Sequence, residues 1–305
     1  MFENLKGDRV IWFIVVIMSI FSLLAVYSAT GSLAFRHHGG DTERYLVKQV
    51  SLLGVGFVVM YLAHLVNYTY YSRIAQLILY VSIPLLLLTL LLGPEINEAR
   101  RWITLPFLDI SFQTSDLAKL GLIMYTARML SKKQHIIKNF DRAFLPILIP
   151  IVVVCMLIVP ADLSTAVLLF LTCIILMFVG RVMLKQIGSA VLVGIIAFLV
   201  YFFVATITPF KGRIGTWKSR LTSFVSPNAD HYQADQSKIA IARGGILGQG
   251  PGKSLQRNFL PQPYSDFIYA IILEEYGLLG GLIVMFLYLG LLYRAIKIFI
   301  KSPGA

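Results

Sequence analysis

The sequence contains few charged residues and few cysteines. Asp, Glu, Lys and Arg make up 14% of its 305 residues, whereas soluble domains carry about 25%. So little charge excludes an ordinary soluble enzyme and an intrinsically disordered chain. The two cysteines, Cys155 and Cys173, both lie in apolar segments, so a secreted disulfide scaffold is excluded as well.

Long apolar segments are abundant instead. Hydrophobic residues make up 57% of the chain, and its mean hydropathy is +0.77. They gather in blocks of about 20 residues, the length of helix that crosses a membrane. Eight spans are predicted: Val10–Ala29, Leu46–Val66, Ile74–Leu92, Ser115–Leu130, Ala143–Pro160, Leu163–Gly180, Ile187–Thr208 and Phe267–Tyr293. Strand-like alternation is absent, so we predict an all-α polytopic membrane helix bundle that forms one domain over residues 1–305.

The charged residues between the spans predict how the chain is oriented. With a cytoplasmic N-terminus, the inner loops hold twelve Lys and Arg residues and the short outer loops hold five. Cytoplasmic loops of membrane proteins carry an excess of Lys and Arg, so this difference favours a cytoplasmic N-terminus. The formal net charge of +12 is therefore attributed to orientation and anionic lipid, with no nucleic-acid partner.

The segment 209–266 is then a long extracytoplasmic loop, and it is basic. Its cations include Arg213, Arg220, Lys238, Arg243 and Lys253. They indicate an anionic partner, either lipid phosphates around a solvated loop or a phosphorylated substrate. The glycine-rich stretch 244–254 lacks the spacing of a nucleotide-binding P-loop. Its tight turns suit close approach to a diphosphate, and they suit simple loop packing equally well.

Besides Asp116 of the fourth span, four acidic residues lie at or within the predicted spans. Asp266 begins the last span, where it is either a helix N-cap or a base facing the outside. Glu274 and Glu275 lie two turns deeper; such residues either face a protein interior or form a proton or ion pathway. Asp162, at an outer boundary, is expected to cap the sixth span.

The stretch 97–119 combines cations, an aromatic residue and a charged pair. Arg100 and Arg101 precede Trp102, a residue suited to the membrane interface. Asp116 and Lys119 are neighbours on one helical face, and their ion pair is expected to fix helix packing.

Five blocks, in this order, resemble the SEDS family (shape, elongation, division and sporulation proteins). They are NEARRWI at Asn97–Ile103, FQTSDLAK at Phe112–Lys119, PADLSTA at Pro160–Ala166, RLTSFVSP at Arg220–Pro227, and GGILGQGPGKSLQRNFLPQPYSDFIYAIILEEYG at Gly244–Gly277. The likeness runs from the first span to the C-terminus. It implies a bundle of ten membrane helices, of which the eight predicted spans lack the last two. The double arginine before Trp102 is more similar to the division branch than to the elongation branch.

The resemblance implies a peptidoglycan glycosyltransferase of the bacterial cytoplasmic membrane, with its active site on the extracytoplasmic face. Such proteins polymerise lipid II, a disaccharide-pentapeptide on undecaprenyl diphosphate. The position of the essential acidic residue matches Asp266, the implied general base. A class B penicillin-binding protein and divisome proteins are the implied partners.

Displacement of a diphosphate leaves negative charge that cations stabilise. The candidates are Arg100, Arg101, Arg213, Arg220, Lys238, Arg243 and Lys253, with Trp102 beside them. A divalent cation, Mg or Mn, is a further candidate for this task.

Two alternatives stay open at this point. In a lipid II flippase or transporter, Asp116, Lys119, Glu274 and Glu275 would form a path across the membrane. In a non-catalytic scaffold, the chain would recruit a class B penicillin-binding protein.

Overall fold

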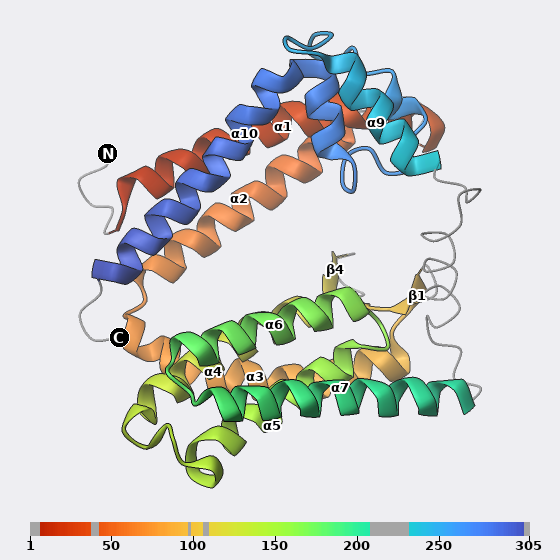
Figure 1. The fold of residues 1–305 in the computed structure, drawn as a ribbon. Coiled ribbons are helices and arrows are strands. Elements are labelled where there is room, and N and C mark those ends of the chain that lie inside the picture. The colour runs from red at the N-terminus through yellow and green to blue at the C-terminus, as the bar shows by residue number, and fades with distance from the viewer. Residues whose placement is uncertain (1–6, 38–42, 97–98, 106–109, 208–231, 302–305) are drawn as a thin grey trace. The chain divides into compact units, whose positions relative to one another are not determined.

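The computed structural model describes residues 7–37, 43–96, 99–105, 110–207 and 232–301 (Figure 1). The chain divides into two compact units, which are described separately. Unit 1 comprises residues 1–66 and 229–305, and unit 2 comprises residues 67–228. The predicted single domain over residues 1–305 stays a prediction.

Helices dominate the described residues. They are α1 (Arg9–His37), α2 (Glu43–Leu65), α3 (Tyr68–Leu92), α4 (Thr114–Lys132), α5 (Leu145–Ile158), α6 (Leu163–Val179), α7 (Leu184–Ile207), α9 (Tyr232–Gly244) and α10 (Ile268–Lys301). Each of the eight predicted spans coincides with one of them, α9 being the additional helix. By length and composition, six of the described helices could cross a membrane. The polytopic helical membrane fold is confirmed, and the chain is an integral membrane protein.

Two spans fall outside those six for different reasons. α6 is apolar but has only 17 residues. α4 carries Asp116, Lys119 and Arg128 along its length, which lowers its hydropathy. One face of α4 is nevertheless buried, because Ala118 and Leu122 are fully enclosed in the core of unit 2.

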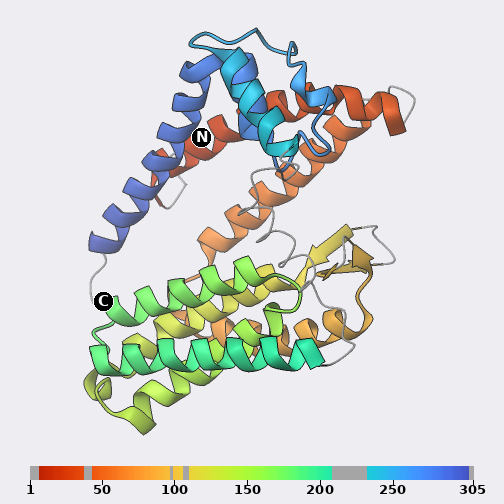
Figure 2. The same cartoon turned by 45° about the vertical axis from the view of Figure 1, so that its right-hand side comes forward.

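Unit 2 is a bundle of α3 to α7 (Figure 2). Its core is apolar and lies where α4, α5 and α6 face one another. The residues at its centre are fully buried: Leu122, Ile147, Ile151 and Cys173. Two short turns, the 3-10 helix η1 (Gln134–Ile136) and the π-helix η2 (Phe140–Phe144), connect α4 to α5.

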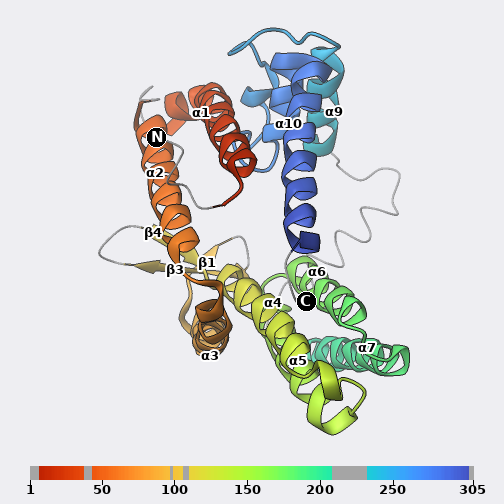
Figure 3. The ribbon, with the colours of Figure 1, turned by 90° about the vertical axis from the view of Figure 1, so that its left-hand side faces the viewer.

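The connection between α3 and α4 is not a plain loop. It contains two antiparallel pairs: β1 (Glu95–Ile96) with β2 (Ala99–Arg100), and β3 (Trp102–Leu105) with β4 (Ile110–Gln113) (Figure 3). In the second pair, Trp102 lies opposite Gln113. Aromatic and β-branched residues in β3 favour extended backbone. The all-α fold therefore includes two small hairpins that the sequence analysis did not predict.

In unit 1, α1 lies beside both α2 and α10, and α9 lies against α10 (Figure 3). The last span, predicted over Phe267–Tyr293, coincides with α10, but this helix is broken at Gly277, where φ is 67° and ψ is −170°. Only glycine adopts such a conformation readily. The half after the break holds about 24 residues and rises roughly 36 Å, enough to cross a membrane without the first half.

The glycine-rich stretch after α9 fills the break. Four backbone hydrogen bonds join this stretch to α10 on either side of Gly277. They run from Gln249 N to Glu274 O (2.9 Å), Gly250 N to Glu275 O (2.9 Å), Leu278 N to Gly245 O (2.9 Å) and Leu279 N to Ile246 O (3.3 Å). A helix end needs such partners, because its terminal N–H and C=O groups have none within the helix. The stretch therefore caps both half-helices.

Two contacts between α1 and α10 mark their relative level. Arg294 forms an ion pair with Asp8, just before α1. Ser28, in the second half of α1, donates a hydrogen bond to Glu275. About 20 residues of helix separate Asp8 from Ser28, which is roughly 30 Å, the thickness of the hydrocarbon core. The two contacts are therefore about one hydrocarbon thickness apart along α1, and the depth of Glu274 and Glu275 within a span stays a prediction.

Candidate functional site

Asp266 lies in an exposed turn of unit 1. α10 begins two residues later, at Ile268, so the Asp266 side chain does not have the N-cap position considered for it. The Ser265 hydroxyl donates a hydrogen bond to Asp266 Oδ1 at 3.3 Å. Among the described residues Asp266 forms no ion pair. Its carboxylate is therefore accessible and not neutralised by a described neighbour.

The chain leading to Asp266 is anchored although its end is exposed. It passes through η3 (Gln256–Asn258), a short 3-10 helix. Leu260 is 2% exposed and packs against Ala29 of α1 and Ile271 of α10. Burial of such a side chain contributes about 1.5–3 kcal/mol. Hydrophobic contacts thus fix the loop to both helices.

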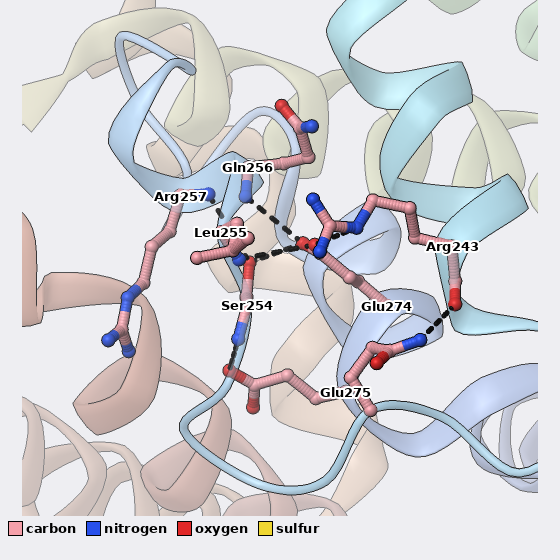
Figure 4. Close-up of polar contacts among 8 residues, drawn as sticks. Arg243, Ser254, Leu255, Gln256, Arg257, Glu274 and Glu275 are labelled. Carbon is pink, nitrogen blue, oxygen red and sulfur yellow. Dashed lines mark hydrogen bonds and ion pairs between the residues drawn. The ribbon is translucent and has the colours of Figure 1, made fainter.

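The Glu274 carboxylate is fully buried and accepts several hydrogen bonds (Figure 4). Its donors are the Ser254 hydroxyl, Leu255 N at 3.1 Å and Gln256 N at 3.3 Å. Arg243, from the last turn of α9, places Nε 3.7 Å from the same carboxylate. One side chain of α10 therefore holds both the loop and a cation.

Glu275 connects the same loop to α1. It accepts hydrogen bonds from the Ser28 hydroxyl and, at 3.4 Å, from Ser254 N. Arg257 closes the ring, because its Nη1 donates to Ser28 O at 2.8 Å and its backbone N donates to the Ser254 hydroxyl at 3.2 Å. The sequence analysis missed Ser28, Ser254 and Arg257 as site residues; the only signal was the cost of two adjacent acids, which demanded partners.

The loop cations differ in how they are held. Lys238 pairs with Asp235 at 3.0 Å on the outside of α9, with 73% of its side chain exposed. Lys253 is exposed in the glycine-rich stretch. Arg243 is 39% exposed and has the buried Glu274 behind it. Arg213 and Arg220 lie outside the described residues.

The candidates on the α3–α4 connection belong to unit 2 and already have protein partners. Arg101 Nη1 lies 3.0 Å from Asp162 Oδ2, and its Nε donates to Ala161 O at 2.9 Å. Arg100 Nη1 donates to Leu91 O at 2.8 Å. Trp102 is half-buried in β3. Arg101 is thus held by two protein groups of unit 2, and its role at a diphosphate stays a prediction.

Two other sequence predictions concern structural contacts in unit 2. Asp162 accepts a hydrogen bond from Thr165 N at 3.1 Å and is the N-cap of α6, as expected. Asp116 Oδ1 lies 2.7 Å from Lys119 Nζ, in the ion pair that their spacing predicted.

Substitutions at Asp162 separate its two contacts. Asp162→Asn keeps a good capping side chain and loses only the charge pair, whose cost is about 1 kcal/mol or less because the pair is partly exposed. Asp162→Ala loses both contacts and is expected to cost about 1–2 kcal/mol more. Thermal unfolding in detergent measures both variants, and equal losses would contradict a capping role.

The described parts of the chain contain no group of three His, Cys, Asp or Glu side chains placed to hold a metal ion. Asp162, Glu274 and Glu275 are engaged by Arg101 or by loop hydrogen-bond donors. These three residues do not fit a protein-held Mg or Mn site.

A family model described as "Cell cycle protein", which covers FtsW, RodA and SpoVE, matches residues 8–304. The chain belongs to this family. Stage V sporulation protein E of Bacillus subtilis (strain 168) is 32% identical to it, over 99% of this chain and 81% of the relative. A protein of Wigglesworthia glossinidia brevipalpis named probable peptidoglycan glycosyltransferase FtsW is 30% identical, over 94% of this chain and 74% of the relative.

Solved structures support the same fold. The rod shape determining protein RodA of Thermus thermophilus superposes with a TM-score of 0.62 at 22% identity, over 99% of this chain and 78% of RodA. A chain from a peptidoglycan synthase complex gives a TM-score of 0.60 at 24% identity, over 94% of this chain and 78% of that chain. The SEDS resemblance is confirmed, and the names of the relatives agree with an FtsW-like glycosyltransferase.

Proposed function

We propose that the chain is a peptidoglycan glycosyltransferase that polymerises lipid II, with Asp266 as its general base. The observation that carries the proposal is an exposed carboxylate on a turn whose supporting loop is anchored to α1 and α10. Family membership and the names of the relatives support the reaction class. The same proposal includes its partners: the chain acts together with a class B penicillin-binding protein and with divisome proteins.

In the proposed reaction, Asp266 accepts the proton of the acceptor's GlcNAc 4-hydroxyl. The hydroxyl oxygen forms a bond to the anomeric carbon of the donor as the bond from that carbon to the lipid diphosphate breaks. Attack opposite the leaving group inverts the anomeric carbon. A base is effective here when it lies within hydrogen-bond reach of the hydroxyl, which an exposed turn permits.

Negative charge develops on the departing diphosphate, so fixed cations nearby lower the barrier. Among the described cations, Arg243 is the best suited, because Glu274 holds its guanidinium. It lies against the α10 segment that follows Asp266, in the same unit. Lys253 is a second cation of the same loop.

The level of this loop also suits a substrate that is anchored in the membrane. Ser28 and Glu275 meet about one hydrocarbon thickness from the Asp8–Arg294 pair, and we infer that they lie near one membrane boundary. A lipid-linked sugar lies at such a boundary. We infer that this boundary is the extracytoplasmic one, with the N-terminus in the cytoplasm.

A polymerisation assay tests the proposal directly. The chain is purified in detergent with its class B penicillin-binding protein and incubated with lipid II. Glycan strands of many disaccharides, visible on a gel and digestible by a muramidase, are the expected product. Absence of polymer from a folded, partner-bound protein would contradict the proposal, and lipid II scrambling in liposomes would then indicate a flippase.

The flippase alternative has less support from the described geometry. A flippase path needs acidic groups that can exchange protons or ions, but the carboxylates of Glu274 and Glu275 are buried and accept hydrogen bonds from the loop. Asp116 is paired with Lys119.

A further inference from the structure

The two buried glutamates have no part in the proton transfer proposed above, yet they hold the parts around it. Glu274 is 0% exposed and Glu275 is 1% exposed. Buried carboxylates are costly unless their oxygens are paired or hydrogen-bonded. Their hydrogen bonds go to one short turn of the loop, residues 254–256, and to Ser28 of α1.

We propose that Glu274 and Glu275 are positioning residues for glycosyl transfer, which fix the Arg243 guanidinium and the Ser254–Arg257 turn in one arrangement. This inference rests on the proposed function. Neither carboxylate touches substrate, because both are enclosed by protein. They act through Arg243 on one side and through the turn that leads to Asp266 on the other (Figure 4).

Arg243 shows how Glu274 would contribute. A free arginine side chain samples many rotamers, and a cation stabilises a transition state best when its orientation is fixed beforehand. The ion pair with Glu274 is closest at Nε, and a guanidinium has four further N–H groups for an anion. Glu274 thus holds Arg243 by one edge while the side chain stays partly exposed.

Glu275 contributes through α1. It binds the Ser28 hydroxyl and Ser254 N, while Arg257 returns from the same turn to Ser28 O. Three segments therefore meet at one ring of polar contacts: the second half of α1, the turn and the first half of α10. The ring limits how far the Asp266 loop can move from α1.

A double-mutant cycle tests the coupling between Glu274 and Arg243. Glu274→Gln keeps the shape and an acceptor oxygen but removes the charge. It is expected to lower kcat roughly 100-fold, with the KM for lipid II within about threefold of wild type. In an Arg243→Gln background the same change is expected to lower kcat clearly less than it does in the wild-type background, because only the contacts of Glu274 to the turn are then left to lose. Independent effects that simply multiply would overturn the proposed role.

A second measurement does not depend on activity. Hydrogen exchange of the Leu255 and Gln256 amides, which donate to Glu274, is expected to accelerate at least about tenfold in Glu274→Ala. Glu43→Gln, at the exposed start of α2, is the matched control and leaves exchange unchanged. Unchanged exchange in Glu274→Ala would overturn the positioning role. If the wild-type chain made no polymer while exchange accelerated, the proposed function would fail and the anchoring of the turn would stand.

Discussion

Asp266→Asn is expected to abolish polymerisation of lipid II, with a loss of roughly 10²–10⁴-fold in kcat. Asparagine has nearly the same size as aspartate but does not accept the hydroxyl proton. Asp266 is exposed and forms no ion pair with a described residue, so the variant should fold normally. Gel analysis of glycan strands over a time course measures the loss.

The control for this variant is the same chemical change elsewhere. Asp141 is exposed in η2 of unit 2, and Asp141→Asn should retain full activity. Both variants should copurify with the penicillin-binding protein and melt at the wild-type temperature. Polymerisation by Asp266→Asn at the wild-type rate would remove the assignment of the base.

Gly277→Ala is expected to destabilise the protein by roughly 3–5 kcal/mol, because it adds backbone strain to a steric clash. The residue has a φ of 67°, and a Cβ there would lie 2.3 Å from Ile246 O. Relief of that contact would push the glycine-rich stretch out of the break in α10. The capping hydrogen bonds and the turn held by Glu274 would then be lost together. The thermal unfolding temperature in detergent and the polymerisation activity should both fall.

A glycine without neighbours provides the comparison. Gly54 lies inside α2, and a Cβ there would meet no atom within 4 Å. Gly54→Ala should leave stability unchanged or slightly increased, because alanine is the better helix former. Melting of Gly277→Ala within experimental error of wild type would show that α10 is not broken in this way.

The membrane helices could be predicted from sequence because hydropathy over about 20 residues is a local property. The N-cap at Asp162 and the Asp116–Lys119 pair followed from short spacings and were also predicted. The break in α10 was not, since averaging over a window hides a single glycine. Glu274 and Glu275 followed closely by Gly277 were the available sign that the helix did not continue unchanged.

The site itself depends on contacts between distant residues, which one sequence does not reveal. Arg101 and Asp162 are 61 positions apart, and their pairing changed the interpretation of both residues. The bond from Ser28 to Glu275 joins residues 247 positions apart. Asp266 was identified through family resemblance, and only the structure shows what supports its loop.

The Ser28–Glu275 contact also joins two residues that are synthesised at different times. At about 5–20 residues per second, α1 leaves the ribosome roughly 12–50 s before Glu275 exists. Until then the Asp266 turn has neither its α10 support nor its connection to α1. A nascent or prematurely terminated chain would therefore occupy the membrane without drawing on the cell's supply of lipid-linked sugar.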